Sequence, residues 1–496
     1  MSVRFSETVS RISSLTSTAD VLNSSADPLI SDVVSDSREV SPGALFCCIK
    51  GENSDGHDYA AAAEAAGACA LLCERPLRTD LPSVVVSSVR EVMGDVAAMV
   101  HGMPAEKLLM TGVTGTNGKT TTTYVLRSIL QAAGFRTGLL GTIVEHDGVT
   151  ERDASRTTPE SCVVQRQLAS MVKNHCGACV METSSHGLYL GRLQGARYDI
   201  PIFTNLNPEH LDFHKDMENY FQAKRLLFTR HVKPDYTGAA NCGDSWGRRL
   251  CEEQPERIRG FALEAEDAFA RVTEWRTALE GTTMRVEMRG LPPLDLQSPL
   301  VGAFNVWNVL CAVTALRGRV DDSAIVAGVA AVPQVPGRLE RYTLPGGACC
   351  FVDFAHTPAA LRSLLTTVRG LTKGRVISIF GHGGGRYPMN RPELGRAASE
   401  LADYAVLTMD NPRDEDPAEI ARAIEGGFTD GGAGHEVILN RTKAIHKGLS
   451  LLKPGDVLVV SGKGPEKYLE IRGKKTPYSD AEAVRSWSGV QTGGWC

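Results

Sequence analysis

The 496-residue sequence has no uninterrupted apolar stretch approaching the ~20 residues that a helix needs to cross a bilayer. Its first ten residues also lack an apolar segment of signal-peptide length. The formal net charge of −5 provides no basic excess that would favour nucleic acid or an acidic membrane surface. We therefore expect a cytosolic protein that binds neither nucleic acid nor membranes.

The 13 cysteines follow no repeated spacing, and no internal repeat or low-complexity tract is present. Cys176 and Cys179 form a single C-x-x-C pair, and without a second pair a zinc site is not expected. The cysteine pairs at 47–48 and 349–350 lie in apolar runs, where cysteine behaves as a small buried hydrophobe. We expect reduced, structural thiols.

What the sequence does contain is a glycine-rich motif at 111–122, Thr-Gly-Val-Thr-Gly-Thr-Asn-Gly-Lys-Thr-Thr-Thr. The apolar run 108–110 before it is typical of a buried strand, and the run 124–133 after it has helical spacing. Glycines let backbone N–H groups approach phosphates, and the N-terminus of a helix attracts anions. Lys119 would then contact the outer phosphates and Thr120 would bind Mg²⁺. The motif predicts binding of a nucleoside triphosphate.

Alternating strand and helix patterns predict an α/β protein of three domains. We expect the domains to span 1–107, 108–336 and 337–496. A Pro-rich junction at 332–338 marks the boundary between the second and the third. Strands are predicted near Cys349–Phe354, Val376–Phe380, Ala405–Thr408 and Val457–Val460. The stretch 241–300 is more irregular and polar, and we expect no chemistry there.

Two polar residues, Glu182 and His210, each follow a predicted strand of the central domain. Ligands of open α/β sheets bind outside the carboxyl ends of the strands, so both should lie near the phosphate motif. A carboxylate and an imidazole beside a triphosphate suit a divalent metal. Lys224, by its spacing alone, reads as an ordinary lysine on a helix surface.

Several segments together resemble the Mur ligases, the ATP-dependent enzymes that extend the cell-wall peptide. The matching segments are 115–121, 182–186, 203–214 and 223–224. The resemblance covers essentially the whole chain. It implies an α/β fold with an N-terminal UDP-binding α/β domain, a central P-loop domain with a mostly parallel sheet, and a C-terminal Rossmann-like domain.

Further motifs resemble one member in particular, which adds the third residue of the stem peptide. Asp36-Ser-Arg38 with Asp55-Gly-His57 looks like its UDP-sugar domain, and Asp410-Asn-Pro-Arg413 like its signature for meso-2,6-diaminopimelate. The resemblance implies an ATP-dependent amide ligase, a monomer, that joins this diamino acid to UDP-N-acetylmuramoyl-L-Ala-D-Glu through an acyl phosphate and a tetrahedral intermediate. Use of L-lysine or another diamino acid is the alternative. A folylpolyglutamate-synthetase-like ligase and a catalytically silent nucleotide-binding protein agree less well with the motifs.

The resemblance also implies a role for each matching residue. Lys119 would contact the γ-phosphate, while Thr120 and Glu182 hold one Mg²⁺. Glu182, His210 and a carbamylated Lys224 would hold or organise a second. Carbamylation would convert a cation into a carboxylate able to ligate Mg²⁺.

Three groups of substrate-binding residues follow from the same resemblance. The residues implied for ATP are Gly115, Thr116, Asn117, Gly118, Lys119, Thr120, Thr121, Asn305, Asn308, Arg338 and Asp353. Those implied for the UDP-linked substrate are Ser37, Thr157, Thr158, Ser184 and Arg192. Those implied for the amino acid are Arg386, Asp410, Asn411, Arg413, Gly462 and Glu466.

The sequence departs from the family pattern at six positions, Glu209, His382, Gly385, Tyr387, Asn440 and Pro465. All but Glu209 lie in the third domain. There the loop 381–387 lacks both of its usual acidic residues but keeps Arg386. We expect the contacts of the third domain to differ most from those of the family.

Overall fold

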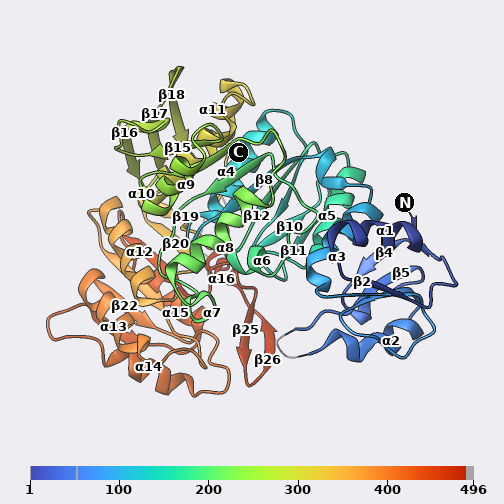
Figure 1. Ribbon diagram of the computed structural model, residues 1–496. Coiled ribbons are helices and arrows are strands. Elements are labelled where there is room, and N and C mark those ends of the chain that lie inside the picture. The colour runs from blue at the N-terminus through green and yellow to red at the C-terminus, as the bar shows by residue number, and fades with distance from the viewer. Residues whose placement is uncertain (1, 52–53, 488–496) are drawn as a thin grey trace. The chain divides into compact units, whose positions relative to one another are not determined.

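The computed structural model describes residues 2–51 and 54–487, which form two compact units. Among these described residues, the first unit comprises those within 2–273, Val286–Leu294 and Trp307–Val329, and the second comprises Glu274–Arg285, Asp295–Val306 and 330–487. In Figure 1 the first unit runs mainly from blue to green and the second is mainly orange and red. The boundaries expected near 107 and 336 stay predictions.

The first unit begins with a five-stranded sheet of order β2-β7-β6-β5-β4. Strands β4 to β7 are parallel, and β2 pairs antiparallel with β7. The elements are β1 (Val3–Arg4), α1 (Phe5–Leu15), β2 (Ala19–Leu22), β3 (Leu29–Ile30), β4 (Asp32–Val34), η1 (Ser37–Glu39), β5 (Ala44–Cys47), η2 (Gly56–Tyr59), α2 (Ala60–Ala65), β6 (Ala68–Cys73), β7 (Ser83–Val86) and α3 (Val89–Val100).

A second sheet of the first unit carries the phosphate motif. Its parallel strands follow the order β9-β12-β8-β13-β14-β15, and β10 pairs antiparallel with β9, so the predicted mostly parallel sheet is confirmed. The elements are η3 (Pro104–Lys107), β8 (Leu109–Thr114), α4 (Lys119–Ala132), β9 (Thr137–Leu140), β10 (Val144–His146), β11 (Glu151–Asp153), α5 (Ser161–Lys173), β12 (Ala178–Glu182), α6 (Ser185–Tyr189), β13 (Ile200–Phe203), α7 (Leu211–His214), α8 (Met217–Thr229), β14 (Gly238–Asn241), α9 (Ser245–Glu253) and β15 (Ile258–Ala262).

The core of this sheet explains its apolar strands. Met110 of β8 and Met181 of β12 are fully buried and pack in one cluster with Leu168 of α5 and Leu227 of α8. Strands of a parallel sheet covered on both faces read as nearly continuous apolar runs, because neither side of the strand meets water. The polar residues at the strand ends therefore stand out in the sequence.

The expectation of irregular structure at 241–300 was wrong. Besides α9 and β15, this stretch forms β16 (Ala270–Ala278), β17 (Gly281–Met288) and β18 (Leu291–Ser298). Buried residues alternate with more exposed ones along β17, where Thr282, Met284, Val286 and Met288 are the buried set. A strand with only one buried face can carry a polar residue at every second position, so it lacks the continuous apolar run of a fully buried strand. The polar composition therefore concealed the strands.

The second unit contains a six-stranded sheet of order β19-β20-β24-β21-β22-β23, parallel except for β19. The four strands predicted from the sequence are all present. The elements are β19 (Glu340–Thr343), η4 (Pro345–Gly347), β20 (Cys349–Asp353), α12 (Pro358–Leu371), β21 (Val376–Phe380), α13 (Asn390–Leu401), β22 (Tyr404–Leu407), α14 (Pro417–Glu425), β23 (Gly434–Val437), α15 (Arg441–Leu451), β24 (Val457–Ser461), β25 (Tyr468–Ile471), β26 (Lys474–Pro477) and α16 (Asp480–Arg485).

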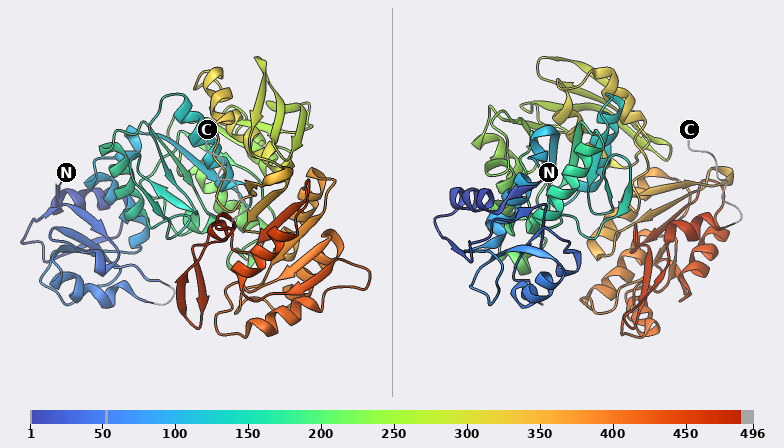
Figure 2. Two further views of the ribbon diagram at one scale, coloured as in Figure 1. Left: turned by 180° about the vertical axis from the view of Figure 1, so that it is seen from behind. Right: turned by 90° about the vertical axis from the view of Figure 1, so that its right-hand side faces the viewer.

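Helices cover both faces of this sheet, as in a Rossmann-like domain. Helices α12, α13 and α14 share one hydrophobic cluster with the strands, and α15 and α16 share the other. The antiparallel strands β25 and β26 form a separate two-stranded sheet, drawn in dark red in Figure 2. Helix α10 (Ala303–Leu316) includes residues of both units, and α11 (Asp322–Ala330) follows it.

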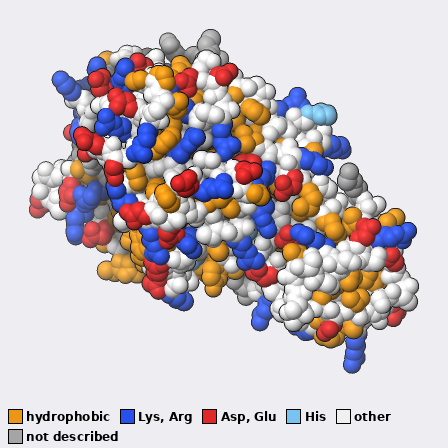
Figure 3. Space-filling model, turned by 45° about the horizontal axis from the view of Figure 1, so that its top comes forward, with side chains coloured by type: hydrophobic (Ala, Val, Ile, Leu, Met, Phe, Trp, Pro, Cys, Tyr) orange, Lys and Arg blue, Asp and Glu red, His pale blue; other side chains and the backbone are white. Residues whose placement is uncertain are grey.

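Acidic and basic side chains are interspersed on the face shown in Figure 3. Acidic and basic side chains of the chain also form exposed or half-exposed pairs, such as Arg225 with Glu253 at 2.7 Å and Arg249 with Glu218 at 2.8 Å. Such pairs stabilise a fold only slightly, because water and salt screen them. Among the residues that the structure describes, no helix combines the length and apolar character needed to cross a membrane.

Candidate active site

Polar residues gather at the carboxyl ends of four neighbouring strands, β9, β12, β8 and β13, in the middle of Figure 1. Thr142 follows β9, Glu182 ends β12, the phosphate motif follows β8, and Thr204 follows β13. In parallel strands these ends meet at one edge of the sheet, which is where ligands of α/β proteins bind. The sheet thus assembles the residues that the sequence placed after separate strands.

The backbone of the phosphate loop needs glycine at two positions. Gly115 and Gly118 have φ values of 147° and 85°, which L side chains rarely adopt. A Cβ atom on Gly115 would lie 1.9 Å from Thr204 Oγ1, and one on Gly118 would lie 2.4 Å from Asn308 Oδ1. Between them, the Asn117 N–H donates to Asn205 Oδ1 (2.9 Å), and Thr204 Oγ1 donates to the Asn117 carbonyl (2.6 Å). The loop is therefore held in shape by its neighbours.

The usual phosphate motif reads Gly-x-x-x-x-Gly-Lys-Thr, which would place its first glycine at position 113. Here that position is Val113, and a glycine stands one residue earlier at 112. The packing of β8 explains this difference. Gly112 lies inside β8, where a Cβ atom would be 2.8 Å from the ring of the fully buried Tyr198. Val113, at the position of the usual first glycine, is also buried within β8. Gly112 thus serves the contact between strand and ring, and Gly115 and Gly118 shape the loop.

Helix α4 presents Lys119 and Thr120 at its first turn, directly after Gly118. Lys119 Nζ donates to the carbonyl oxygens of Gly115 (3.0 Å) and Thr116 (2.9 Å). Thr120 is buried, and its hydroxyl donates to Glu182 Oε2 at 3.0 Å. A cationic side chain and a helix N-terminus therefore lie at the same loop, and both favour phosphate binding. Thr121 is buried in the same turn.

The carboxylate of Glu182 is fully buried and accepts three hydrogen bonds. One comes from Thr120, and the others come from the backbone N–H of Thr142 (2.8 Å) and its hydroxyl (3.0 Å). A carboxylate and a threonine hydroxyl beside a phosphate loop are the oxygen donors that Mg²⁺ prefers, so the residues present fit this ion. Thr142 ends a polar cluster after a strand, but it is not among the site residues predicted from the sequence.

Lys224 of α8 is buried with 1% of its surface exposed, so the interpretation as a helix-surface lysine was wrong. Its Nζ donates to the Gly115 carbonyl at 2.8 Å and lies 4.5 Å from the centre of the Tyr220 ring. Burial, reinforced by the nearby charge of Lys119, lowers the pKa of Lys224 well below its ordinary value. Burial therefore makes the neutral amine more accessible here than in a lysine exposed to water.

His210 lies at the start of α7 with its side chain 46% exposed. Its ring packs edge-on against His186, with ring centres 4.8 Å apart. His214, from the same helix, lies 3.0 Å from Ser185 Oγ through Nε2, and burial lowers its pKa to about 4. Within the described residues, no three histidine, cysteine, aspartate or glutamate side chains form a ready metal cage. Hydroxyl oxygens or a modified side chain would have to complete one.

Four of the five residues expected at the UDP-linked substrate lie around the end of β12. Thr158 Oγ1 donates to the Glu182 carbonyl (3.1 Å) and accepts from the Ser184 N–H (3.0 Å). Thr157 Oγ1 is 3.0 Å from Thr142 Oγ1, and Arg192 donates to the Thr158 carbonyl (3.3 Å). The fifth, Ser37, comes from η1 in the N-terminal sheet region.

The Asp55-Gly-His57 motif holds η2 against the end of β6 through hydrogen bonds. His57 is buried, with Nδ1 2.5 Å from Asp55 Oδ1 and Nε2 accepting from the Glu74 N–H at 2.9 Å. Asp55 also accepts from Arg75 at 3.0 Å. Both ring nitrogens of His57 are thus engaged, and the motif connects η2 to the end of β6.

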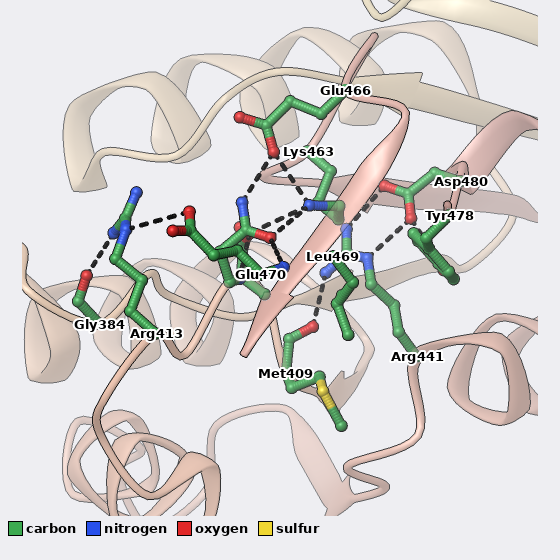
Figure 4. Close-up of polar contacts among 12 residues, drawn as sticks. Gly384, Met409, Arg413, Arg441, Lys463, Glu466, Leu469, Glu470, Tyr478 and Asp480 are labelled. Atoms are coloured by element: carbon green, nitrogen blue, oxygen red, sulfur yellow. Dashed lines mark hydrogen bonds and ion pairs between the residues drawn. The ribbon is translucent and has the colours of Figure 1, made fainter. Parts of the chain in front are cut away.

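In the second unit, the Asp410-Asn-Pro-Arg loop contacts residues near the end of β24 (Figure 4). Asn411 Nδ2 donates to Glu466 Oε2 at 2.9 Å, and Lys463 Nζ donates to both Asn411 Oδ1 (3.0 Å) and Glu466 Oε2 (2.9 Å). Gly462 brings its backbone close, since a Cβ atom there would lie 2.8 Å from Asp410 Oδ2. Four of the six residues predicted for the amino acid therefore form one cluster.

The other two, Arg413 and Arg386, flank Gly383. A Cβ atom on Gly383 would be 3.3 Å from Arg413 NH1 and 3.5 Å from Arg386 Cγ. Arg413 has a left-handed φ of 51° and is held by strand β25, where its N–H donates to the Glu470 carbonyl (3.2 Å). Its guanidinium lies 3.6 Å from the Glu470 carboxylate and donates to the Gly384 carbonyl. Arg386 is exposed.

The remaining residues predicted for ATP lie in three places. Asn305 and Asn308 are both on α10, where Asn305 donates to the Val301 carbonyl at 2.8 Å and Asn308 accepts from Thr122 at 3.4 Å. Asp353 ends β20 and accepts from the backbone N–H of Leu339 and of Ala355, each at 2.8 Å; burial raises its pKa. Arg338 lies over the Phe354 ring at 5.3 Å.

Comparison with known families agrees with this arrangement. Residues 29–107 match the model described as Mur ligase family, catalytic domain; residues 113–316 match Mur ligase middle domain; and residues 337–464 match Mur ligase, glutamate ligase domain. The fold and the site define an ATP-dependent, amide-forming ligase of three α/β domains. The chain belongs to the Mur ligase family, so the resemblance found in the motifs is confirmed.

Individual relatives resemble the chain along most of its length. It is 38% identical over 469 residues to the UDP-N-acetylmuramoyl-L-alanyl-D-glutamate–2,6-diaminopimelate ligase of Bacillus licheniformis, covering 92% of this chain and 94% of the relative. The enzyme of that name from Streptomyces avermitilis is 39% identical over 471 residues, covering 92% of each chain. A solved structure of a ligase of that name has a TM-score of 0.72 at 28% identity and covers 98% of both chains.

The folylpolyglutamate synthase of Mycobacterium tuberculosis, solved with ADP, shares the fold. Its TM-score is 0.59 at 18% identity, and the match covers 74% of this chain and 90% of that one. The N-terminal residues 29–107 match a Mur ligase model. The fold alone does not separate the two kinds of ligase.

Proposed function

We propose that the protein uses ATP to join meso-2,6-diaminopimelate to UDP-N-acetylmuramoyl-L-Ala-D-Glu. The observation that carries this proposal is the loop at 410–413 in the second unit, where Asn411 donates to the Glu466 carboxylate and Arg413, two residues later, supplies a guanidinium. A diamino acid whose distal end carries both a carboxylate and an ammonium matches these two charges. The names of the similar relatives support the same reaction.

The reaction we propose has two steps. ATP phosphorylates the terminal carboxylate of the UDP-linked dipeptide, which gives an acyl phosphate and ADP. The amine of the diamino acid then attacks the acyl carbon, and the tetrahedral intermediate collapses to the amide and phosphate. In both steps the protein positions the reactants and neutralises charge on the phosphoryl group. Lys119 and the N-terminus of α4 would act on the phosphates.

We propose that two Mg²⁺ ions act with ATP, where they would neutralise phosphate charge. Thr120 and Glu182, 3.0 Å apart, would hold the first. Glu182, His210 and a carbamylated Lys224 would organise the second. The neutral Lys224 amine can add CO₂ to form N–COO⁻ with release of a proton, and this product supplies the oxygen ligands that Mg²⁺ prefers.

The residues implied for each substrate are proposed in the same roles. The phosphate loop, Asn305, Asn308, Arg338 and Asp353 would bind ATP, and the cluster at the end of β12 with Ser37 would bind the UDP-linked dipeptide. Domains of 1–107, 108–336 and 337–496 would divide these tasks. We also propose that the enzyme is a monomer that acts in the cytosol on a soluble nucleotide-linked precursor.

Removing the Thr142 hydroxyl tests the support of Glu182. Thr142→Val keeps the backbone N–H that bonds to Glu182 but deletes the hydroxyl contact at 3.0 Å. We expect KM for Mg–ATP to rise by roughly tenfold, since one hydrogen bond to a charged group is lost. Steady-state kinetics would measure it, with Thr150→Val, at an exposed threonine, as control. An unchanged KM would mean that Thr142 does not support the metal site.

A panel of amino acids tests the proposed substrate. With ATP and the UDP-linked dipeptide, phosphate release should favour meso-diaminopimelate over L-lysine by at least ~10²-fold in kcat/KM, because lysine has no distal carboxylate to accept hydrogen bonds from Arg413. Arg413→Ala should lose this preference. Arg422→Ala, which removes an exposed arginine of α14, should retain it.

Other outcomes of the panel are equally informative. Comparable kcat/KM for lysine and diaminopimelate in the unmutated enzyme would contradict the specificity while leaving the ligase reaction in place. Phosphate release that depends on a folate and glutamate, and not on the UDP-linked dipeptide, would instead favour the folylpolyglutamate-synthetase-like alternative.

A further inference from the structure

A buried lysine that the sequence analysis did not single out lies at the centre of the proposed amino-acid subsite. The side chain of Lys463 is fully buried directly after β24. Its Nζ is 2.9 Å from Glu466 Oε2, 3.0 Å from Asn411 Oδ1 and 3.7 Å from Asp410 Oδ1. Figure 4 shows Lys463 pointing toward Glu466, and all three acceptors belong to residues proposed for the amino acid.

Burying an ammonium is costly unless polar partners replace its water. In this chain Lys463 lies between Gly462 and Gly464, whose backbone conformations place it next to its polar partners. Gly462 and Gly464 have φ values of 113° and 50°, and a Cβ on Gly464 would lie 2.7 Å from Phe354 Cβ. These glycines bring the backbone close enough for Lys463 to turn inward, and Glu466 follows three residues later.

The contacts of Lys463 continue to Arg413 through one chain of hydrogen bonds. Asn411 Oδ1 accepts from Lys463 and also from the backbone N–H of Glu470 at 2.9 Å. The Glu470 carbonyl in turn accepts from the Arg413 N–H at 3.2 Å. Lys463 is thus connected both to the Glu466 carboxylate and to the backbone of Arg413.

We propose that Lys463 is a positioning residue that sets the subsite's preference for a distal ammonium; this inference rests on the proposed function. Lys463 and Asn411 both donate to Glu466 Oε2, so the orientation of this carboxylate is held by two donors on one oxygen. The ammonium also offsets one of the two acidic groups, Asp410 and Glu466. The cluster then carries one net negative charge, which matches one substrate ammonium.

The test compares two substrates in the full-length enzyme. meso-Diaminopimelate has a distal carboxylate and ammonium, whereas L-2-aminopimelate has the distal carboxylate alone. In Lys463→Met we expect KM for diaminopimelate to rise about tenfold or more, because Glu466 loses a charged donor. KM for ATP should be unchanged. The preference for diaminopimelate over 2-aminopimelate should fall by a similar factor, which a loss of stability alone would not produce.

Two further variants separate positioning from other effects. Glu466→Gln should show the same loss of preference, and the double variant Lys463→Met/Glu466→Gln should add little to it, because both changes act on one carboxylate. Lys475→Met is the matched control. It removes an exposed ammonium that lies 4.3 Å from the Tyr468 ring, the ring that Lys463 approaches to 5.4 Å. It should keep the preference.

Several results would overturn the inference. Additive effects of the two changes, or an unchanged preference in a folded Lys463→Met protein, would show that Lys463 does not act through Glu466. If Lys463→Met does not fold, Lys463→Met/Glu466→Gln is measured instead, because this double variant also removes the negative charge of Glu466 that the lysine had offset. If the double variant does not fold either, the role of Lys463 is structural and the inference is wrong. Absence of turnover with diaminopimelate in the unmutated enzyme would contradict the proposed function itself.

Discussion

Lys119→Ala is expected to lower kcat/KM for ATP by about 10³-fold or more, since a cation at a transferring phosphoryl group contributes on this scale. The variant should remain folded. The side chain is only partly buried, and the hydrogen bonds it gives up, to the Gly115 and Thr116 carbonyls, are worth about 1 kcal/mol each in net stability. Phosphate release in steady state and thermal unfolding would measure the two effects.

The control for this prediction is Lys173→Ala, at an exposed lysine that ends α5 in the same unit. It removes the same charge away from the phosphate loop and should keep normal turnover. Near-normal turnover of purified Lys119→Ala would contradict the assignment of the phosphate loop. A large loss of activity accompanied by unfolding would instead show that Lys119 acts by stabilising the loop.

Lys224→Ala is expected to be inactive and to regain part of its activity when a short carboxylic acid such as acetate is added. The lysine is fully enclosed, so its truncation leaves room for a small acid at the position of the proposed carbamate. The lowered pKa of Lys224 favours the neutral amine that CO₂ requires. Mass spectrometry of the native protein in bicarbonate should detect the added CO₂, and activity should fall when bicarbonate is removed.

Lys233→Ala is the matched control for this rescue. Lys233 is a partly buried lysine of the same unit that pairs with Asp199 at 2.9 Å and donates to the Leu108 carbonyl. Its variant should gain nothing from the added acid. An unmodified Lys224 amine in the protein bound to ATP and Mg²⁺ would reject the carbamate. Rescue of both variants would show that the acid acts elsewhere.

The sequence was most informative where function depends on backbone shape. The phosphate motif occupies consecutive residues, with Gly115, Gly118, Lys119 and Thr120 close together in the chain. Its pattern alone predicted a strand, a loop and a helix, and the structure has β8, the loop and α4 in this order. The four strands predicted in the second unit were found for a similar reason, because buried parallel strands are short apolar runs. Amphipathic strands such as β17 were missed, since half of their residues are polar.

Contacts between distant segments could not be predicted in this way. Thr142 supports Glu182 across 40 residues, and Lys463 reaches Asn411 across 52. Lys224 was interpreted as exposed, because the helical spacing of α8 does not reveal which neighbours cover its face. Family resemblance supplied a role for Lys224 but none for Thr142 or Lys463.

The sequence by itself determined the class of the protein, because a phosphate loop and its flanking strand and helix are local features written in consecutive residues. It also determined the family, through motifs that occur in a fixed order along the chain. Only the tertiary structure decided which polar groups meet. The carboxyl ends of β9, β12, β8 and β13 converge because parallel strands align in register, and burial near this edge lowers the pKa of Lys224. In the second unit, folding encloses Lys463 beside the Glu466 carboxylate.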